Sequence, residues 1–306
     1  MESRATHALL LLRRMIVVLA LVAAGLLLLW GWYSSDLILS LHRERITVLP
    51  GSFGLAFEEV TFKASDGTPL KGWFVPSPVG SDATIILCHG RGTCRSDILP
   101  ATQHLVSRGH YNLLYFDFRN HGESGGRKTT LGRLETLDLE AALDWVKKAK
   151  PDRSRRVGVY GLSMGAAVVI LAAARRPEIE AVAAESAYGS IGRSVAQFGK
   201  ILYGLPAWAV PYTMWWTRAR LGFNPETAAA ERVVGRIAPR PIFLLQGGAD
   251  DRVPPSEGER LFNRAGEPKS LWTVPGAGHG GLWEAAGREY EDRLLKFFDG
   301  VFRRAG

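Results

Sequence analysis

The sequence predicts an α/β fold, with a mostly parallel, doubly wound sheet, a helical insertion and one transmembrane helix ahead of the domain. Three features of the 306 residues point to it. Residues 15–33 are apolar and carry no charge. From residue 57 onward, short apolar runs alternate with longer helical patterns, which is typical of a parallel sheet covered by helices. A segment over about 187–239, rich in aromatic residues, interrupts that alternation.

The N-terminal apolar run predicts a membrane anchor. Residues 15–33 are about long enough to cross a bilayer core of roughly 30 Å. The run continues past the small residues at 22–24, so we expect an uncleaved signal anchor and not a cleaved signal peptide. Basic residues precede it and place residues 1–14 in the cytoplasm by the positive-inside rule: Arg4, Arg13 and Arg14. The remainder is then expected outside, in the periplasm or at the cell surface.

After a linker over 34–56, residues 57–306 are expected to form the α/β domain. A hairpin around Asp66-Gly67 opens it. Strands are predicted at 59–62, 70–75, 84–88, 112–116, 156–160, 181–184, 241–246 and 270–274. Helices are predicted from about 96, over 131–150, 163–176 and 257–265, and in a last segment that ends near 302.

Charge and cysteine content argue against two function classes. The net charge is +8, but the basic residues occur as scattered pairs and form no stripe, so no nucleic-acid binding is expected. Cys88 and Cys94 are too few for a disulfide framework and match no zinc motif, and we predict no bridge between them. No metal and no cofactor are expected.

A candidate nucleophile lies in the stretch Gly161-Leu162-Ser163-Met164-Gly165. The stretch falls between a predicted strand and a predicted helix, which is the context that a G-x-S-x-G turn requires. Glycines two residues on either side of the serine allow strand and helix to approach closely. The turn would place the Ser163 hydroxyl at the helix N-terminus, where partial positive charge favours a developing anion.

A serine needs a general base and a carboxylate that orients the base. With this type of turn, the chain order is serine, acid, histidine. His279 is the only histidine after His121, which makes it the candidate base. The acid should follow the strand over 241–246, where two aspartates are adjacent. We choose Asp250 over Asp251 because of its spacing from the strand end.

An oxyanion hole needs two backbone N–H groups that point at one position. Met164, directly after the nucleophile, supplies the first. The loop after the strand over 84–88 supplies the second, and Arg91 is the expected donor because it follows His89-Gly90. His89 itself is expected to brace this loop.

These segments together resemble the α/β-hydrolase superfamily, and within it the esterases, serine aminopeptidases and BEM46-like proteins. The resemblance covers about residues 57–302 and rests on five motifs in the family's order: Cys88-His89-Gly90, 117–124, 161–165, 247–254 and Gly278-His279. Two positions depart from it. Gln246 stands where many relatives have histidine, and Arg91 is bulkier than usual, so that it is expected to narrow the acyl site or attract an anionic substrate.

The resemblance implies a serine hydrolase that cleaves a carboxylic ester through an acyl-enzyme. The insertion over about 187–239 lies where relatives carry a lid, and its aromatic residues suit an apolar, lipid-like acyl substrate. These residues are Tyr188, Phe198, Tyr203, Trp208, Tyr212, Trp215 and Trp216. They could equally pack the lid onto the sheet or lie on the bilayer. A peptidase, a thioesterase or an acyltransferase would use the same triad.

Two hypotheses from other classes explain less of the sequence than a hydrolase does. A metal enzyme built from His89, Asp117, His121 and Glu123 matches no zinc spacing and leaves the serine turn unexplained. A membrane-tethered binding protein without turnover keeps the fold, but it leaves the presence of nucleophile, acid and base without a purpose.

Overall fold

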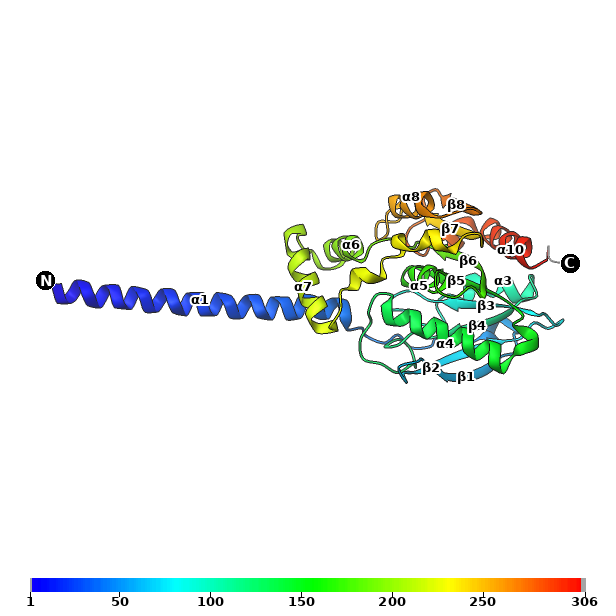
Figure 1. Cartoon of the computed structure of the whole chain (residues 1–306), viewed down its shortest axis with the longest axis horizontal. Coiled ribbons are helices and arrows are strands. Elements are labelled where there is room, and N and C mark those ends of the chain that lie inside the picture. The colour runs from blue at the N-terminus through cyan, green and yellow to red at the C-terminus, as the bar shows by residue number, and fades with distance from the viewer. Residues whose placement is uncertain (1, 304–306) are drawn as a thin grey trace.

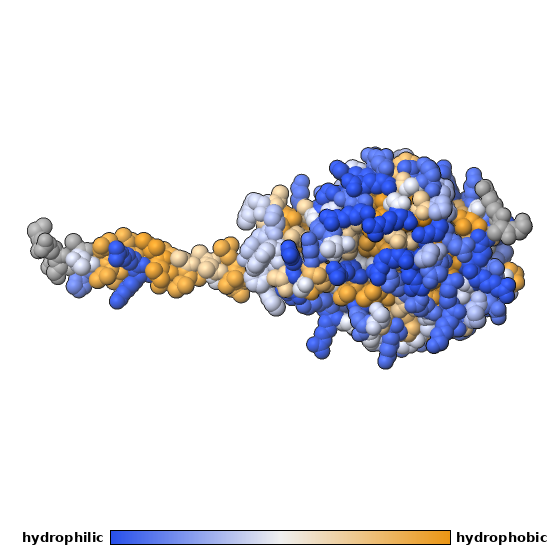
Figure 2. All heavy atoms as spheres, viewed as in Figure 1, coloured by the Kyte–Doolittle hydropathy of each residue, from blue (hydrophilic) through white to orange (hydrophobic). Residues whose placement is uncertain are grey.

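The computed structural model describes residues 2–303 and shows a long helix that leads into one α/β domain (Figure 1). Helix α1, Glu2–Leu39, projects from the domain. The segment Thr6–Leu39 is apolar and long enough that it could span a membrane, and its N-terminal position is also that of a signal sequence. Apolar residues cover the projecting helix, whereas the visible face of the domain is mostly hydrophilic (Figure 2).

The helix extends beyond the predicted anchor at its C-terminal end. The expected span 15–33 lies inside α1, but the first six residues of the expected linker 34–56 are helical as well. They stay helical because Ser34, Ser35 and Leu39 are buried against the domain. The chain then continues through a 3₁₀ turn, Pro50–Phe53, to the first strand.

Within residues 2–303, eight strands form one sheet in the order β1-β2-β4-β3-β5-β6-β7-β8. The pairs β1-β2 and β2-β4 are antiparallel, and the pairs from β4-β3 to β7-β8 are parallel. The predicted hairpin and all predicted strands are present. Their bounds are Glu58–Lys63, Pro69–Val75, Ala83–Cys88, Asn112–Phe116, Arg156–Leu162, Ile179–Glu185, Ile242–Gly247 and Lys269–Val274 for β1 to β8.

Helices cover both faces of the sheet. On one face Leu143 of α4 and Val168 of α5 belong to a buried apolar cluster, and on the other Leu294 and Phe298 of α10 belong to a second. This two-sided burial explains why the central strands are apolar throughout. The helices are α2 Leu99–Thr102, α3 His104–Ser107, α4 Arg133–Ala149, α5 Met164–Ala173, α8 Pro255–Arg264, α9 Leu282–Ala286 and α10 Arg288–Phe302, with a 3₁₀ turn at Pro151–Arg153.

The helix expected from residue 96 begins later and is divided into α2 and α3. A turn occupies residues 94–97, where the Cys94 amide donates to the Asp97 carboxylate and the Asp97 amide donates to the Cys94 carbonyl. That turn directs the chain away from the end of β3 before the first helical residue, Leu99.

The insertion between β6 and β7 is helical and lies beside the end of α1 (Figure 1). It contains α6, Ile191–Tyr203, and α7, Val210–Leu221, followed by short 3₁₀ turns. Because the insertion follows the carboxyl end of β6, it stands over the edge of the sheet at which β3 and β5 also end. We call the segment 187–239 the lid.

Candidate active site

Ser163 lies on a sharp turn between β5 and α5. Its φ of 56° is in the left-handed region, which is costly for a residue with a side chain. A Cβ atom at Gly161 would lie 2.3 Å from the Gly165 carbonyl oxygen, and one at Gly165 would lie 2.2 Å from the Cys88 carbonyl oxygen. The close approach of strand, helix and β3 therefore requires both glycines of the motif.

A continuous chain of hydrogen bonds leads from Asp250 to Ser163. His279 Nε2 lies 3.0 Å from Ser163 Oγ, and its Nδ1 lies 2.8 Å from Asp250 Oδ2. The other Asp250 oxygen accepts the amides of Arg252 and Val253, at 3.0 and 2.8 Å. With an ionised carboxylate at Nδ1, that nitrogen carries the proton and the Nε2 lone pair faces the serine. The structure thus brings the three predicted side chains together.

The two adjacent aspartates differ in their surroundings. Asp250 is 3% exposed and faces His279, whereas Asp251 is exposed and its carbonyl accepts a hydrogen bond from Gln197. The loop of Asp250 also touches the loop of His279, since the Ala249 amide donates to the Ala277 carbonyl at 2.9 Å. This contact fixes the position of the Asp250 loop relative to the His279 loop.

The predicted oxyanion donors are Met164, at the start of helix α5, and Arg91, in the loop after β3. Met164 is the first residue of α5, and the first amides of a helix have no partner within it. A Cβ at Gly90 would lie 3.7 Å from Ser163 Cβ, which places the loop before Arg91 against the nucleophile. His89 braces this loop: its Nδ1 donates to the Gly90 carbonyl at 2.7 Å, and its Nε2 accepts the Phe118 amide at 3.0 Å.

These contacts require a neutral His89, with one ring nitrogen donating and the other accepting. Burial lowers the pKa of His89 to about 4, so the ring is neutral at physiological pH. His89 thus makes the bracing contacts that the sequence predicted for it.

Arg91 was expected to narrow the acyl site or to attract an anionic substrate, and the structure contradicts the second of these expectations. Arg91 lines the cavity beside Ser163, but its Nη2 donates to the carbonyls of Leu37 and Ile38, at 2.7 and 2.9 Å. These carbonyls belong to the last turn of α1, where they lack helical partners and carry partial negative charge. The guanidinium therefore ties α1 to the site and is not free to attract an anionic substrate.

An apolar cavity of about 60 Å³ lies beside Ser163. Five parts of the chain enclose it: the end of α1, the loop of Arg91, the loop of Leu131, the nucleophile turn, and the lid. The described residues that line it are Ser34, Leu37, Ile38, Arg91, Leu131, Ser163, Tyr188, Ser194, Val195, Phe198, Gly199, Tyr203, Leu205 and Thr213. The predicted lid therefore contributes most of the wall, and three of its predicted aromatics face the cavity.

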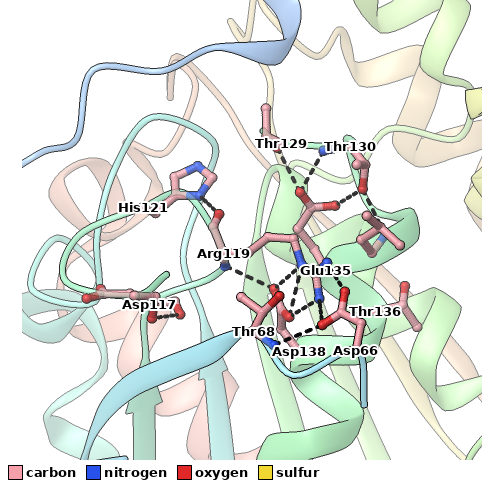
Figure 3. A network of polar contacts seen from close by, with 12 residues as sticks. Asp66, Thr68, Asp117, Arg119, His121, Thr129, Thr130, Glu135, Thr136 and Asp138 are labelled. Atoms are coloured by element: carbon pink, nitrogen blue, oxygen red, sulfur yellow. Dashed lines mark hydrogen bonds and ion pairs between the residues drawn. The ribbon is translucent and has the colours of Figure 1, made fainter. Parts of the chain in front are cut away.

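A polar network holds the loop that presents Leu131 to this cavity (Figure 3). Arg119 Nη2 donates to Oδ1 of Asp138, a residue of helix α4, at 2.6 Å. Glu135, one turn earlier on that helix, accepts the Thr130 amide at 2.7 Å. Since all of these carboxylates and donors are buried, breaking one contact would leave a partner unsatisfied. The network therefore fixes the loop to α4.

The residues of the alternative metal site have other partners. Asp117 accepts the Arg95 amide at 2.8 Å and forms an ion pair with its guanidinium, and Glu123 pairs with the same guanidinium at 2.5 Å. Over residues 2–303, no group of three or more histidine, cysteine, aspartate or glutamate side chains is arranged to hold a metal ion. Cys88 and Cys94 are both free thiols.

One buried cluster beside the nucleophile was not predicted. The Ser163 amide donates to the Glu185 carbonyl at 2.8 Å, and the Glu185 carboxyl accepts hydrogen bonds from Tyr160 at 2.9 Å and Tyr290 at 2.8 Å. Burial raises the pKa of Glu185 to about 7. The position of Glu185, directly after the apolar run 181–184, was the signal available in the sequence.

The wall formed by α1 was also missed. Ser34, Leu37 and Ile38 belong to the stretch that was expected to be a linker. The apolar run Leu37-Ile38-Leu39 after Asp36 was the available signal, since an exposed linker has no need of it.

Sheet order, nucleophile turn and lid position together define the α/β-hydrolase fold. Comparison with known proteins agrees. Residues 88–234 match the model of the X-Pro dipeptidyl-peptidase (S15) family. The esterase Pf2001 of Pyrococcus furiosus superposes with a TM-score of 0.74 at 29% identity, over 87% of this chain and 98% of the esterase. The chain therefore has the α/β-hydrolase fold, and the family model and the esterase structure that it matches agree with this fold.

Two relatives share most of its length. The uncharacterised protein YfhR of Escherichia coli K12 is 29% identical over 247 residues, which are 78% of this chain and 80% of YfhR. The uncharacterised protein Rv2307c of Mycobacterium tuberculosis is 28% identical over 283 residues, which are 92% of this chain and 93% of Rv2307c. The esterase and peptidase names among the matches support a hydrolase.

Proposed function

We propose that this chain is a membrane-anchored serine hydrolase that cleaves a carboxylic ester through an acyl-enzyme on Ser163. The observation that carries the proposal is the hydrogen-bonded chain from Asp250 through His279 to Ser163 on the strained turn. A serine hydroxyl is a weak nucleophile at neutral pH, and a neutral imidazole oriented by a carboxylate is the arrangement that activates it.

In the first half-reaction, Ser163 Oγ attacks the ester carbonyl carbon while His279 Nε2 takes its proton. Asp250 stabilises the imidazolium that forms. The amides of Met164 and Arg91 hold the oxyanion of the tetrahedral intermediate, in the field of the α5 N-terminus. When the intermediate collapses, the bond to the alcohol breaks and His279 returns the proton to the departing oxygen. An acyl-enzyme remains.

In the second half-reaction, a water molecule takes the place of the alcohol. His279 removes a proton from this water, its oxygen attacks the acyl carbonyl, and the same two amides hold the second oxyanion. The bond to Ser163 Oγ then breaks, and the proton passes from His279 to the serine. The carboxylic acid leaves, and the cycle needs no metal and no cofactor.

The apolar cavity favours an ester over a peptide. The match to a dipeptidyl-peptidase family makes peptide bonds the second candidate. A free peptide N-terminus carries an ammonium group, which needs a carboxylate or a similar acceptor when it is buried. Among the described residues that line the cavity, the one charged side chain is Arg91, and its guanidinium is engaged by α1. An uncharged acyl chain suits these surroundings.

Packing of α1 on the domain supports a retained anchor. Cleavage after residue 33 would remove the Leu27 carbonyl, which accepts the Tyr212 hydroxyl at 2.7 Å, and the Gly31 backbone on which Trp216 packs. The basic residues before the span favour a cytoplasmic N-terminus and a catalytic domain on the opposite side. Protease treatment of sealed cells or spheroplasts checks this orientation: an outward domain is digested without lysis, and an inward one is protected.

Labelling with a fluorophosphonate probe tests the nucleophile. We expect the purified full chain to label, and Ser163→Ala and His279→Ala to label at least a thousandfold more slowly. Hydrolysis of p-nitrophenyl esters, p-nitrophenyl thioesters and alanine p-nitroanilide then ranks ester, thioester and amide. A faster amide reaction would favour the peptidase.

The matched control is Asp251→Asn, which changes the neighbouring exposed carboxylate and should label like the parent. If the folded parent neither labels nor hydrolyses any ester, the proposed function is wrong and a non-catalytic binding protein takes its place.

A further inference from the structure

The end of the N-terminal helix is part of the cavity in which the ester would bind. Ser34, Leu37 and Ile38 of α1 line it together with Val195 and Phe198 of the lid. Phe198 also lies edge-on to the His279 ring, with centroids 6.2 Å apart, so this cavity adjoins the catalytic histidine directly. Without α1, one side of the cavity would be open.

Helix α1 and lid helix α7 are joined over about three turns. The Tyr212 hydroxyl donates to the Leu27 carbonyl at 2.7 Å, and the Thr213 hydroxyl donates to Ser34 Oγ at 3.1 Å. Further along, Arg220 pairs with Asp36. These contacts join residues 27–36 of α1 to residues 212–220 of α7, and we call this interface the seam.

A glycine permits the closest approach in this seam. A Cβ atom at Gly31 would lie 2.0 Å from Trp216 Nε1, so the indole packs directly on the α1 backbone. Gly25, two turns earlier, has nothing within 4 Å of the same position. The seam therefore begins between these two glycines.

The seam places the lid at the depth of a membrane surface. Tyr212 reaches Leu27, six residues before Tyr33 at the end of the expected span, or about 9 Å along the helix axis. The lid also presents large apolar side chains to the exterior. Trp208 is 77% exposed, Trp215 is 59% exposed and Tyr203 is 47% exposed. Tryptophan and tyrosine at this depth are typical of the interface between lipid and water.

We infer that the substrate is an acyl ester resident in the membrane, whose apolar chain passes from the bilayer along the α1–α7 seam and lies against Leu37 and Ile38. This inference rests on the proposed function. The cavity is apolar, begins at Ser163 and ends at a helix whose preceding residues are the anchor itself. A chain that leaves the bilayer beside α1 would thus reach the nucleophile along the apolar side chains of Leu37, Ile38 and Phe198.

Filling the cavity from the α1 side tests the position of the chain. In the reconstituted full-length protein, we expect Leu37→Trp to lower kcat/KM for p-nitrophenyl palmitate at least tenfold, and to lower that for p-nitrophenyl acetate much less. Leu37→Ala, which enlarges the cavity, should shift the optimum to longer chains. Leu29→Trp is the matched control, because Leu29 lies on the same helix, is 67% exposed and should leave both rates unchanged.

The route is tested with vesicles of ether-linked phosphatidylcholine, which contain no ester of their own. A long-chain diacylglycerol that does not exchange between vesicles is placed either with the enzyme or in a separate population. We expect turnover at least tenfold faster when enzyme and substrate share a vesicle. A soluble ester of short chain, added to both, should react equally in the two mixtures.

The outcomes separate this inference from the proposed function. If the parent hydrolyses p-nitrophenyl acetate through Ser163 but Leu37→Trp, Leu37→Ala and Leu29→Trp share one chain-length profile, the α1 wall is not a binding surface and the inference fails alone. Equal turnover in shared and separate vesicles overturns the route from the bilayer. Retained labelling by a small fluorophosphonate shows that each variant is folded. A parent without Ser163-dependent hydrolysis ends both proposals.

Discussion

The nucleophile turn and the seam between α1 and α7 both border one cavity, and they are held together differently. The turn depends on backbone atoms in contact, at Gly161, Gly165 and the end of β3. The seam depends on side chains from segments far apart in the chain, such as Arg220 and Asp36, which are 184 residues apart. Under our proposals, reactivity depends on the backbone of the turn, whereas selection of the substrate depends on contacts that include α1.

The largest effect on activity should come from Asp250, the acid that orients His279. Asp250→Asn would leave the geometry nearly intact, but the amide would favour the wrong imidazole tautomer. We expect kcat to fall about ten-thousand-fold, with KM little changed. Steady-state kinetics on a short-chain p-nitrophenyl ester provides the measurement. The adjacent Asp251→Asn should keep the parent's kcat, and an equal loss in both variants would disprove the assignment of Asp250.

The next effect concerns the stability of the nucleophile turn. In Gly165→Ala, the new methyl group would clash with the Cys88 carbonyl oxygen. Because this oxygen belongs to the backbone of a central strand, it cannot shift without disturbing the sheet. We expect the free energy of unfolding to fall by about 3 kcal/mol or more, or expression of folded protein to be lost. Gly300→Ala, in helix α10 with open space around it, should be neutral or slightly stabilising in the same denaturation series.

A pH-dependent effect is expected from Glu185. Its pKa is raised from 4.5 to about 7 in the fold, so the folded state keeps a proton that the unfolded chain releases. Stability from this group is complete below about pH 4.5 and is lost as the pH rises through 7, by up to about 3 kcal/mol. Glu185→Gln should remove that slope, because the amide oxygen still accepts from both tyrosines and does not titrate.

Urea denaturation at pH 5.5, 7 and 8.5 measures this difference. Glu180→Gln, on the same strand but paired with Arg156 at its other end, should keep the parent's pH dependence. A slope unchanged in Glu185→Gln would show that this carboxyl is ionised throughout the range.

The smallest effect should come from the seam. Gly31→Leu places a side chain where Trp216 packs, and the indole can move at modest cost. We expect about a three- to tenfold fall in the ratio of palmitate to acetate hydrolysis, with the short-chain rate much less affected. Gly25→Leu is the matched control, because it makes the same substitution on the same helix at a position with nothing within 4 Å. If both variants behaved alike, the seam would have no part in chain selection.

The catalytic residues could be predicted from the sequence because their positions depend on residues close by in the chain. Ser163 needed glycines at fixed distances, and the chain order left His279 as the only candidate base. Each expected strand was an apolar run closed by polar or turn residues, and each is present in the sheet. Such patterns depend on neighbours within a few residues, which a sequence displays directly.

The direction of the Arg91 side chain could not be read in this way. Its backbone position follows from the His89-Gly90 turn, but the guanidinium points to carbonyls at the end of α1, more than fifty residues earlier. The same is true of Glu185, whose tyrosine partners come from β5 and α10. Partners of this kind become neighbours only when the sheet and its helices assemble.

The sequence by itself determined the α/β class, the strand-turn-helix around Ser163, the candidate acid and base, and an apolar N-terminal segment. These follow from hydrophobic periodicity and from backbone requirements that glycine alone satisfies. Only the tertiary structure decided that α1 continues to Leu39, docks on the lid and encloses the cavity. The physical reason is that these residues remain helical through burial, through the bonds of Arg91 to the last carbonyls and through the ion pair of Asp36 with Arg220. No local propensity specifies such distant partners.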